Sequence, residues 1–200
     1  MSAPPALILA STSSARRAVL EGAGVAFEAV RPDVDEDAAK DELLGKGAGP
    51  REIAEALAAA KALAVSKDRP GLVIGADQTL DLQGRLYDKA ADLAAARARL
   101  AELRGRSHQL HSAVAVAEHG RAVWAETVSA TLTMRDFSDA FLDDYLAREG
   151  AAALGSVGCY RLEGVGVQLF EAIDGDYFTI LGLPLMGLLE LLRRRGVVAS

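Results

Sequence analysis

A run of hydroxyl and guanidinium groups near the amino end is the first set of residues that could do chemistry. Residues 11–14 read STSS and are followed by Ala15, Arg16 and Arg17. They lie between an apolar run at 6–10 and a predicted helix at 15–21, whose first backbone N–H groups have no acceptor within the helix. These donors together predict an anion site at this turn. The glycines and final Lys-Ser/Thr of a P-loop are missing, and a serine-rich helix cap with two solvated arginines is the alternative.

A carboxylate at Asp77 is the second candidate. It comes directly after the apolar segment 72–76, LVIGA, and is expected where the apolar part of a strand ends. Open α/β sheets bind ligands beyond the carboxyl ends of their strands, so Asp77 is expected to face a cleft. A carboxylate there could hold a divalent cation or take a proton from water. An aspartate that merely ends the strand by capping a turn is the alternative.

The third candidate is an acidic segment at 33–37, which contains Asp35 and Glu36 and is expected to be a loop. Such a segment is usually only solvated, but beside a phosphate site it would indicate metal-assisted phosphoryl chemistry. Lys61 and Lys89 are, on pattern alone, surface cations. His108 and His111 are three residues apart, which on a strand puts them on opposite faces and makes them a poor metal pair.

Composition excludes several classes of protein. The 200 residues are 50% hydrophobic and 25% charged, as in ordinary globular proteins. The net charge of −6 argues against broad nucleic-acid binding, which needs a basic surface. No apolar stretch is long enough for a membrane span, and the run at 6–10 has neither the length nor the basic flank of a signal peptide. The single cysteine, Cys159, forms no internal disulfide and is expected to be buried; a cytoplasmic location follows as the prediction.

Strand and helix patterns alternate along the chain, which predicts an α/β fold with a mixed, twisted central sheet and flanking helices. Residues 38–50 have no decided pattern, and residues 159–173 look strand-like. One domain is expected over residues 1–200. The predicted strands are 6–10, 27–30, 72–80, 107–117 and 122–134, and the predicted helices are 15–21, 51–65, 92–103, 138–146 and 184–195.

Taken in order, five segments resemble the Maf family of nucleoside triphosphate pyrophosphatases. They span nearly the whole chain, and the set is specific although no single segment is. The segments are LILASTSSARRAVLEGAGVAFE at 7–28, the pair Asp35-Glu36, GADQTL at 75–80, GRSHQLHSAVAV at 105–116, and EGVGVQLFEAIDGDYFTILGLPL at 163–185.

The resemblance implies an enzyme that cleaves a nucleoside triphosphate between its α and β phosphates and requires a divalent metal ion, Mg²⁺ or Mn²⁺. It also implies two lobes around a cleft, often in a homodimer. Ser11, Arg16 and Arg17 would bind the triphosphate, and Lys61 and Lys89 would neutralise its charge. Asp77 would be the general base, and Glu36 would serve the metal or the water. Glu36 and Asp77 would be the metal ligands, and with Lys61 they form the implied catalytic group.

Two further positions indicate which nucleobase the substrate carries. The branch of the family that acts on dTTP and UTP usually has Asp-Thr and Gln-Gly where this chain has Asp77-Gln78 and Glu163-Gly164. The present pattern is similar to the branch that hydrolyses 7-methyl-GTP, and this resemblance implies that Gln78 and Glu163 bind the substrate. A carboxylate at Glu163 can accept from the N1–H and amine of guanine.

The alternatives are a dTTP/UTP pyrophosphatase, a non-catalytic nucleotide-binding regulator of septum formation, and a structural α/β domain in which these motifs are incidental.

Overall fold

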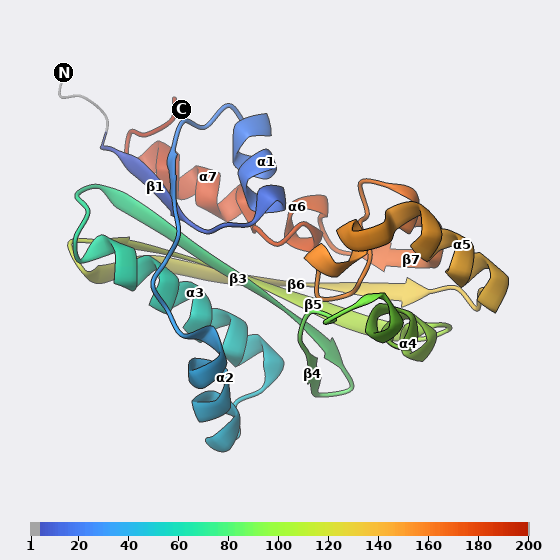
Figure 1. Cartoon of the computed structure of the whole chain (residues 1–200). Coiled ribbons are helices and arrows are strands. Elements are labelled where there is room, and N and C mark those ends of the chain that lie inside the picture. Colours follow the sequence, from blue (N-terminus) through green and yellow to red (C-terminus); the bar gives the residue numbers. More distant parts are fainter. Residues whose placement is uncertain (1–4, 200) are drawn as a thin grey trace.

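A computed structural model describes residues 5–199 as a seven-stranded mixed sheet with helices packed against it (Figure 1). The strand order is β2-β1-β3-β5-β6-β7, with β4 paired to β3. β1 is parallel to β2 and β3, and every other pairing is antiparallel. The predicted mixed α/β fold is therefore confirmed. The strands are β1 Leu7–Ala10, β2 Glu28–Val30, β3 Leu72–Leu82, β4 Arg85–Tyr87, β5 Ser107–Glu118, β6 Arg121–Met134 and β7 Phe170–Asp174.

All five predicted helices form, and polar side chains cap several of them at the amino end. Asp92 and Ser138 accept hydrogen bonds from the backbone N–H groups of Ala95 and Phe141, which satisfies donors that a helix leaves free. The helices are α1 Ser14–Gly22, α2 Glu36–Gly45, α3 Pro50–Ser66, α4 Leu93–Leu103, α5 Asp139–Glu149, α6 Tyr177–Ile180 and α7 Leu185–Arg194, with 3₁₀ segments η1 Gly150–Gly155 and η2 Val165–Leu169.

Two sequence expectations need correction. The acidic segment is not a loop throughout, because Asp35 caps α2 by accepting from the backbone N–H of Ala38 and Glu36 is the first residue of that helix. Residues 38–45, whose sequence pattern favours neither a helix nor a strand, belong to α2. Of the strand-like residues 159–173, only those from 170 onward pair with β6; those before them lie in turns and in η2, where closely spaced glycines permit tight bends.

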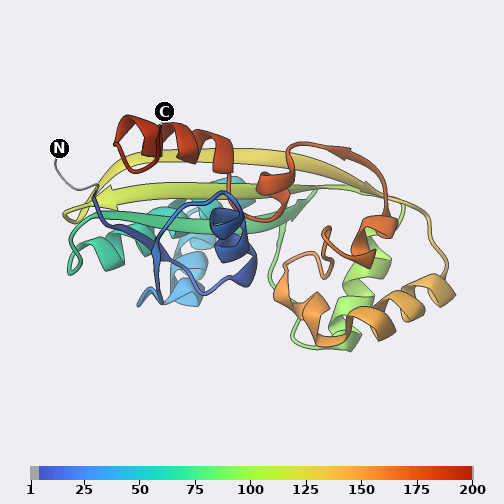
Figure 2. The same cartoon turned by 90° about the horizontal axis from the view of Figure 1, so that it is seen from above.

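The helices form two lobes along the long strands β3, β5 and β6 (Figure 2). In the first lobe, α1 and α7 bury leucines and valines against β1 and the first half of β3, and α3 covers the opposite face. In the second lobe, α4 and α5 pack over the second half of β3 and over β5 and β6. The long strands thus belong to both lobes and connect them.

Close packing of α3 on β3 determines where the functional groups meet. Gly75 lies against the helix, and a Cβ atom there would come within 2.2 Å of the Ala58 carbonyl oxygen and 2.4 Å of the Ala62 nitrogen. Alanines on α3 and β5 complete the small-residue interface. Because alternate strand residues share a face, Asp77 points the same way as Gly75 and meets Lys61, which lies in the same turn of α3 that covers Gly75.

No helix within residues 5–199 has the length and apolar character needed to cross a membrane. Cys159 is buried, as expected. His108 and His111 contact different partners: His108 Nε2 lies 2.7 Å from the Tyr160 hydroxyl, and His111 Nδ1 lies 2.7 Å from Ser129 Oγ.

Candidate active site

One cavity of about 1460 Å³ lies between the lobes and collects most of the residues singled out from the sequence. Its walls come from the turn before α1, the first turns of α2, the middle of α3 and β3, the segment after β4, and the loop after η1. Arg17 does not line it and is exposed on α1, so its expected role in binding phosphate has no support from its position. The sequence-predicted residues that line the cavity are Ser11, Arg16, Glu36, Lys61, Asp77, Gln78, Lys89 and Glu163.

The cavity opens at a gap in the pairing along one edge of β3. β1 ends at Ala10, which pairs with Gly75, and β4 begins to pair only at Leu80. Asp77 lies within that gap, in the middle of β3. The expectation that Asp77 stands at the end of an apolar strand is therefore wrong, whereas the predicted continuation of this strand to residue 80 is confirmed. The strand that ends here is β1, and its end leaves the neighbouring strand accessible.

Lys61 joins two carboxylates at the floor of this gap. Its Nζ atom lies 2.7 Å from Asp77 Oδ1 and 2.7 Å from Glu36 Oε2. The Lys61 side chain is 6% exposed and that of Asp77 is 11% exposed, whereas that of Glu36 is 44% exposed and open to the cavity. A buried ammonium with two anionic partners is well compensated, and it holds both carboxylates in a defined place.

Ser11, in the turn between β1 and α1, and Arg16, in the first turn of α1, line the cavity beside this group. Ser13 caps α1, and Arg16 Nε donates to the Gly182 carbonyl at 2.8 Å. Its NH1 atom donates to Ser11 Oγ at 3.4 Å. Burial lowers the pKa of Arg16, while the negative charges of Asp77 and Glu36 act in the opposite direction. Ser11, Arg16 and Asp77 line the same cavity, so the predicted convergence of this turn with Asp77 occurs.

Gln78 points to the other face of β3 and is largely occupied by protein contacts. Its Nε2 atom lies 2.9 Å from Ser112 Oγ, 3.1 Å from the Thr179 carbonyl and 3.0 Å from the Ile180 carbonyl. These bonds hold α6 against the sheet. Any contact of Gln78 with a substrate therefore falls to its carbonyl oxygen.

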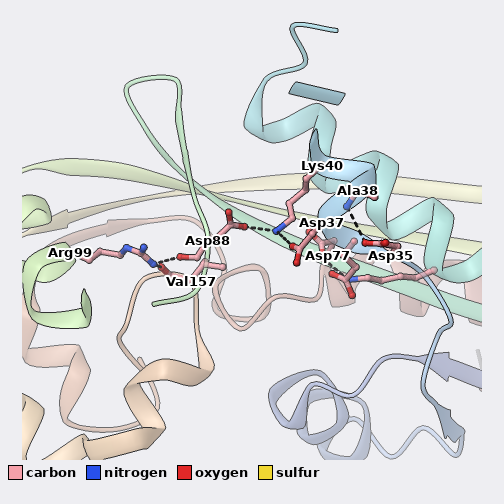
Figure 3. A network of polar contacts seen from close by, with 10 residues as sticks. Asp35, Asp37, Ala38, Lys40, Asp77, Asp88, Arg99 and Val157 are labelled. Carbon is pink, nitrogen blue, oxygen red and sulfur yellow. Dashed lines mark hydrogen bonds and ion pairs between the residues drawn. The ribbon is translucent and has the colours of Figure 1, made fainter. Parts of the chain in front are cut away.

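No local sequence pattern predicts the polar bridge that crosses the cavity between α2 and the segment after β4. Lys40 Nζ lies 2.6 Å from Asp88 Oδ1 and 3.0 Å from Asp37 Oδ1 (Figure 3). Partial burial lowers the pKa of Lys40, but the hydrogen bonds to the two aspartates outweigh this and leave it raised. Because the partners are 48 residues apart, no local pattern could have joined them.

The same bridge holds the residue next to Lys89. Arg99 of α4 donates to the backbone carbonyl of Asp88 and, at 2.8 Å, to that of Val157. Lys89 is exposed and lines the cavity, and the neighbouring Asp88 is bonded to Lys40 of the first lobe and to Arg99 of the second.

Comparison with known proteins matches the amino-acid sequence of this chain to a family. The model for Maf-like proteins matches residues 6–195. The chain belongs to the Maf-like protein family. Its predicted membership is confirmed, and all the cavity residues named above fall within the matched Maf-like region.

Curated Maf-like relatives match over almost their whole length. The nucleoside triphosphate pyrophosphatase of Caulobacter vibrioides (strain ATCC 19089 / CIP 103742 / CB 15) is 65% identical over 190 residues, covering 95% of this chain and 96% of the relative. That of Granulibacter bethesdensis (strain ATCC BAA-1260 / CGDNIH1) is 52% identical over 189 residues, covering 94% and 96%. The 7-methyl-GTP pyrophosphatase of Brucella abortus biovar 1 (strain 9-941) is 49% identical over 189 residues, covering 94% and 95%.

Proposed function

We propose that this protein hydrolyses nucleoside triphosphates between the α and β phosphates, giving a nucleoside monophosphate and pyrophosphate, with 7-methyl-GTP as its preferred substrate. The observation that carries the proposal is the Lys61-bridged pair of Glu36 and Asp77, which shares one cavity with Arg16 and Ser11. The names of the relatives agree with this reaction, and some of them specify 7-methyl-GTP.

The roles of the residues follow from what phosphoryl transfer requires. The reaction needs charge neutralisation, positioning of the phosphates and an activated water more than covalent help. Arg16, Ser11 and the free N–H groups at the start of α1 bind phosphate oxygens, and Lys89 adds charge from the other lobe. Asp77 takes the proton of the attacking water, and Lys61 holds that carboxylate in place. The water oxygen bonds to the α phosphorus as the bond to the bridging oxygen breaks, and pyrophosphate leaves.

A divalent cation, Mg²⁺ or Mn²⁺, fits the carboxylates present. Magnesium is commonly held by one or two protein carboxylates together with phosphate oxygens and water. Glu36 and Asp77 supply such a pair, both within 2.7 Å of the same ammonium. Within residues 5–199 no group of three or more histidine, cysteine or acidic side chains is arranged for a metal, so phosphate oxygens and water would supply the remaining ligands. The cation would add positive charge beside the phosphates.

Preference for 7-methyl-GTP rests on the charge of the cavity wall at Glu163. This carboxylate accepts from donors of a guanine edge and favours a purine that 7-methylation has made cationic. Glutamine in its place would keep the shape and remove the charge. We therefore expect Glu163→Gln to lower the preference for 7-methyl-GTP over GTP, as measured by the ratio of kcat/KM.

The test is to incubate the protein and Mg²⁺ or Mn²⁺ with a panel containing 7-methyl-GTP, GTP, dTTP, UTP and ATP. Monophosphate and pyrophosphate are quantified separately from orthophosphate. Asp77→Asn, which keeps the shape of the side chain, is expected to lose nearly all turnover while still binding nucleotide.

Three outcomes would overturn the proposal. The wild-type protein could release nucleoside diphosphate and orthophosphate, it could bind nucleotide without turnover, or Asp77→Asn could retain full activity. A ranking led by dTTP or UTP would overturn the substrate assignment alone. We also propose that residues 1–200 act as one domain, and that the protein works in the cytoplasm as a homodimer, which light scattering would test.

A further inference from the structure

Arg161 lies between two carboxylates at the second-lobe wall of the cavity. Its Nε atom is 3.3 Å from Glu163 Oε1, and its NH1 atom is 3.6 Å from Glu149 Oε2. The side chains of Arg161 and Glu163 are 43% and 33% exposed, and both residues line the cavity. A donor and an acceptor of opposite charge therefore stand side by side, open to a ligand.

Glu149 differs from its partners because it is almost fully enclosed. Its side chain is 8% exposed, and within residues 5–199 its Oε2 atom has no hydrogen-bond partner. It is the last residue of α5, where the helix dipole disfavours a negative charge. The cation that compensates it is Arg161. A buried carboxylate in this position serves to hold the guanidinium.

The loop carrying Arg161 is closed tightly around this contact by two glycines. A Cβ atom on Gly164 would lie 3.2 Å from Glu149 Oε1, and one on Gly166 would lie 2.4 Å from the Arg161 carbonyl oxygen. Larger residues would displace the loop from the carboxylate. The position of Arg161 is therefore determined by the end of α5 and by the backbone of its own loop.

We infer that Arg161 and Glu163 together recognise a lactam edge of the base, and that Glu149 is a positioning residue for Arg161. The inference rests on the proposed function. A guanidinium only donates hydrogen bonds and a carboxylate only accepts them. Guanine, 7-methylguanine, hypoxanthine and uracil each present a carbonyl beside an N–H group, which complements this pair. Adenine and cytosine reverse the order of donor and acceptor along that edge.

The pair is available for such an exchange. Its 3.3 Å contact is longer than the 2.7–2.9 Å usual for charged N–H···O⁻ bonds, so a well-placed base edge forms better bonds with both partners. With the reversed edge of adenine or cytosine, the Arg161 guanidinium would face a hydrogen-bond donor and the Glu163 carboxylate would face an acceptor. Because the pair is only partly buried, we expect a discrimination of about tenfold to a hundredfold.

The experiment compares kcat/KM for 7-methyl-GTP, GTP, inosine triphosphate and UTP with that for ATP and CTP, by pyrophosphate release. The wild type should prefer the first group. Arg161→Met should lower the GTP-to-ATP ratio about tenfold, mainly through KM. Glu149→Gln should lower the ratio in the same direction, and adding it to Arg161→Met should cause no further change. Arg148→Met is the matched control, because Arg148 is exposed on the same helix and pairs with Asp144 outside the cavity.

Failure of this inference is separable from failure of the proposed function. If no triphosphate releases pyrophosphate, the proposed function falls. If pyrophosphate is released but the GTP-to-ATP ratio is the same in the wild type and in Arg161→Met, the inference falls. It also falls if the effects of Glu149→Gln and Arg161→Met on that ratio are additive. Should Glu149→Gln fail to fold, the comparison of the wild type with Arg161→Met still decides the inference.

Discussion

Replacing Lys61 by methionine should destabilise the protein because it leaves two carboxylates without their shared cation. Methionine keeps most of the volume of the side chain, so packing against β3 changes little. Breaking a buried ion pair by removing one partner costs about 3–5 kcal/mol. Asp77 is nearly buried, but Glu36 is 44% exposed and remains hydrated, which places the expected loss near the lower end, at about 3 kcal/mol.

The assay is urea unfolding followed by circular dichroism. With a slope of about 2 kcal/mol per molar, the midpoint should fall by about 1.5 M. The double variant Lys61→Met with Asp77→Asn removes both buried charges and should recover most of the stability without recovering activity. Lys46→Met is the control, since Lys46 forms only an exposed pair with Glu42 and should shift the midpoint little.

Strict additivity would refute this reasoning. If the losses of stability in Lys61→Met and Asp77→Asn simply sum in the double variant, the two side chains do not interact energetically as their 2.7 Å contact requires. An unchanged midpoint in Lys61→Met would refute it as well.

Three further predictions follow from the packing and the charges. Burial lowers the pKa of His108 to about 4 from 6.5, so the neutral form is favoured in the folded state. The unfolding free energy should therefore fall by up to about 3 kcal/mol as the pH drops from 6.5 towards 4, and His108→Gln should remove this part of the pH dependence. Gly75→Ala should push α3 away from β3, lowering the unfolding free energy by about 2 kcal/mol and reducing turnover because Lys61 moves with the helix. Lys40→Met and Asp88→Asn should each raise the KM for nucleotide about threefold, with no further rise in the double variant, as steady-state kinetics would measure.

Each of these has an outcome that would contradict it. The His108 prediction fails if the variant and the wild type lose the same stability between pH 6.5 and 4. The packing argument fails if Gly75→Ala behaves like Gly22→Ala, a position with no atom near the added methyl group. If the increase in KM in the double variant equals the product of the increases in Lys40→Met and Asp88→Asn, the two side chains act independently and the argument about the bridge fails.

Local sequence determined the elements and several of the groups they present. The strict apolar run of β1, the caps at Asp92 and Ser138, and the hydroxyl-rich turn before α1 all express preferences of neighbouring residues, so they could be predicted. Local signals were also enough to select Asp77 as a candidate. They misjudged its setting, because the length of a strand does not reveal where its neighbour ends.

Contacts between distant segments were beyond such signals. Lys61 meets Asp77 because Gly75 and the alanines of α3 let the helix approach the strand closely, which depends on how two separate elements pack. The ion pairs Lys40–Asp88 and Arg161–Glu149 likewise depend on how separate segments of the chain pack together.

The sequence by itself therefore determined which chemical groups this protein carries and on which kind of element each one stands. Only the tertiary structure decided which of them meet, as the exclusion of Arg17 from the cavity and the inclusion of Lys40 illustrate. The physical reason is that helix and strand preferences act over a few residues, whereas partners in space are selected by packing that closes long loops of chain.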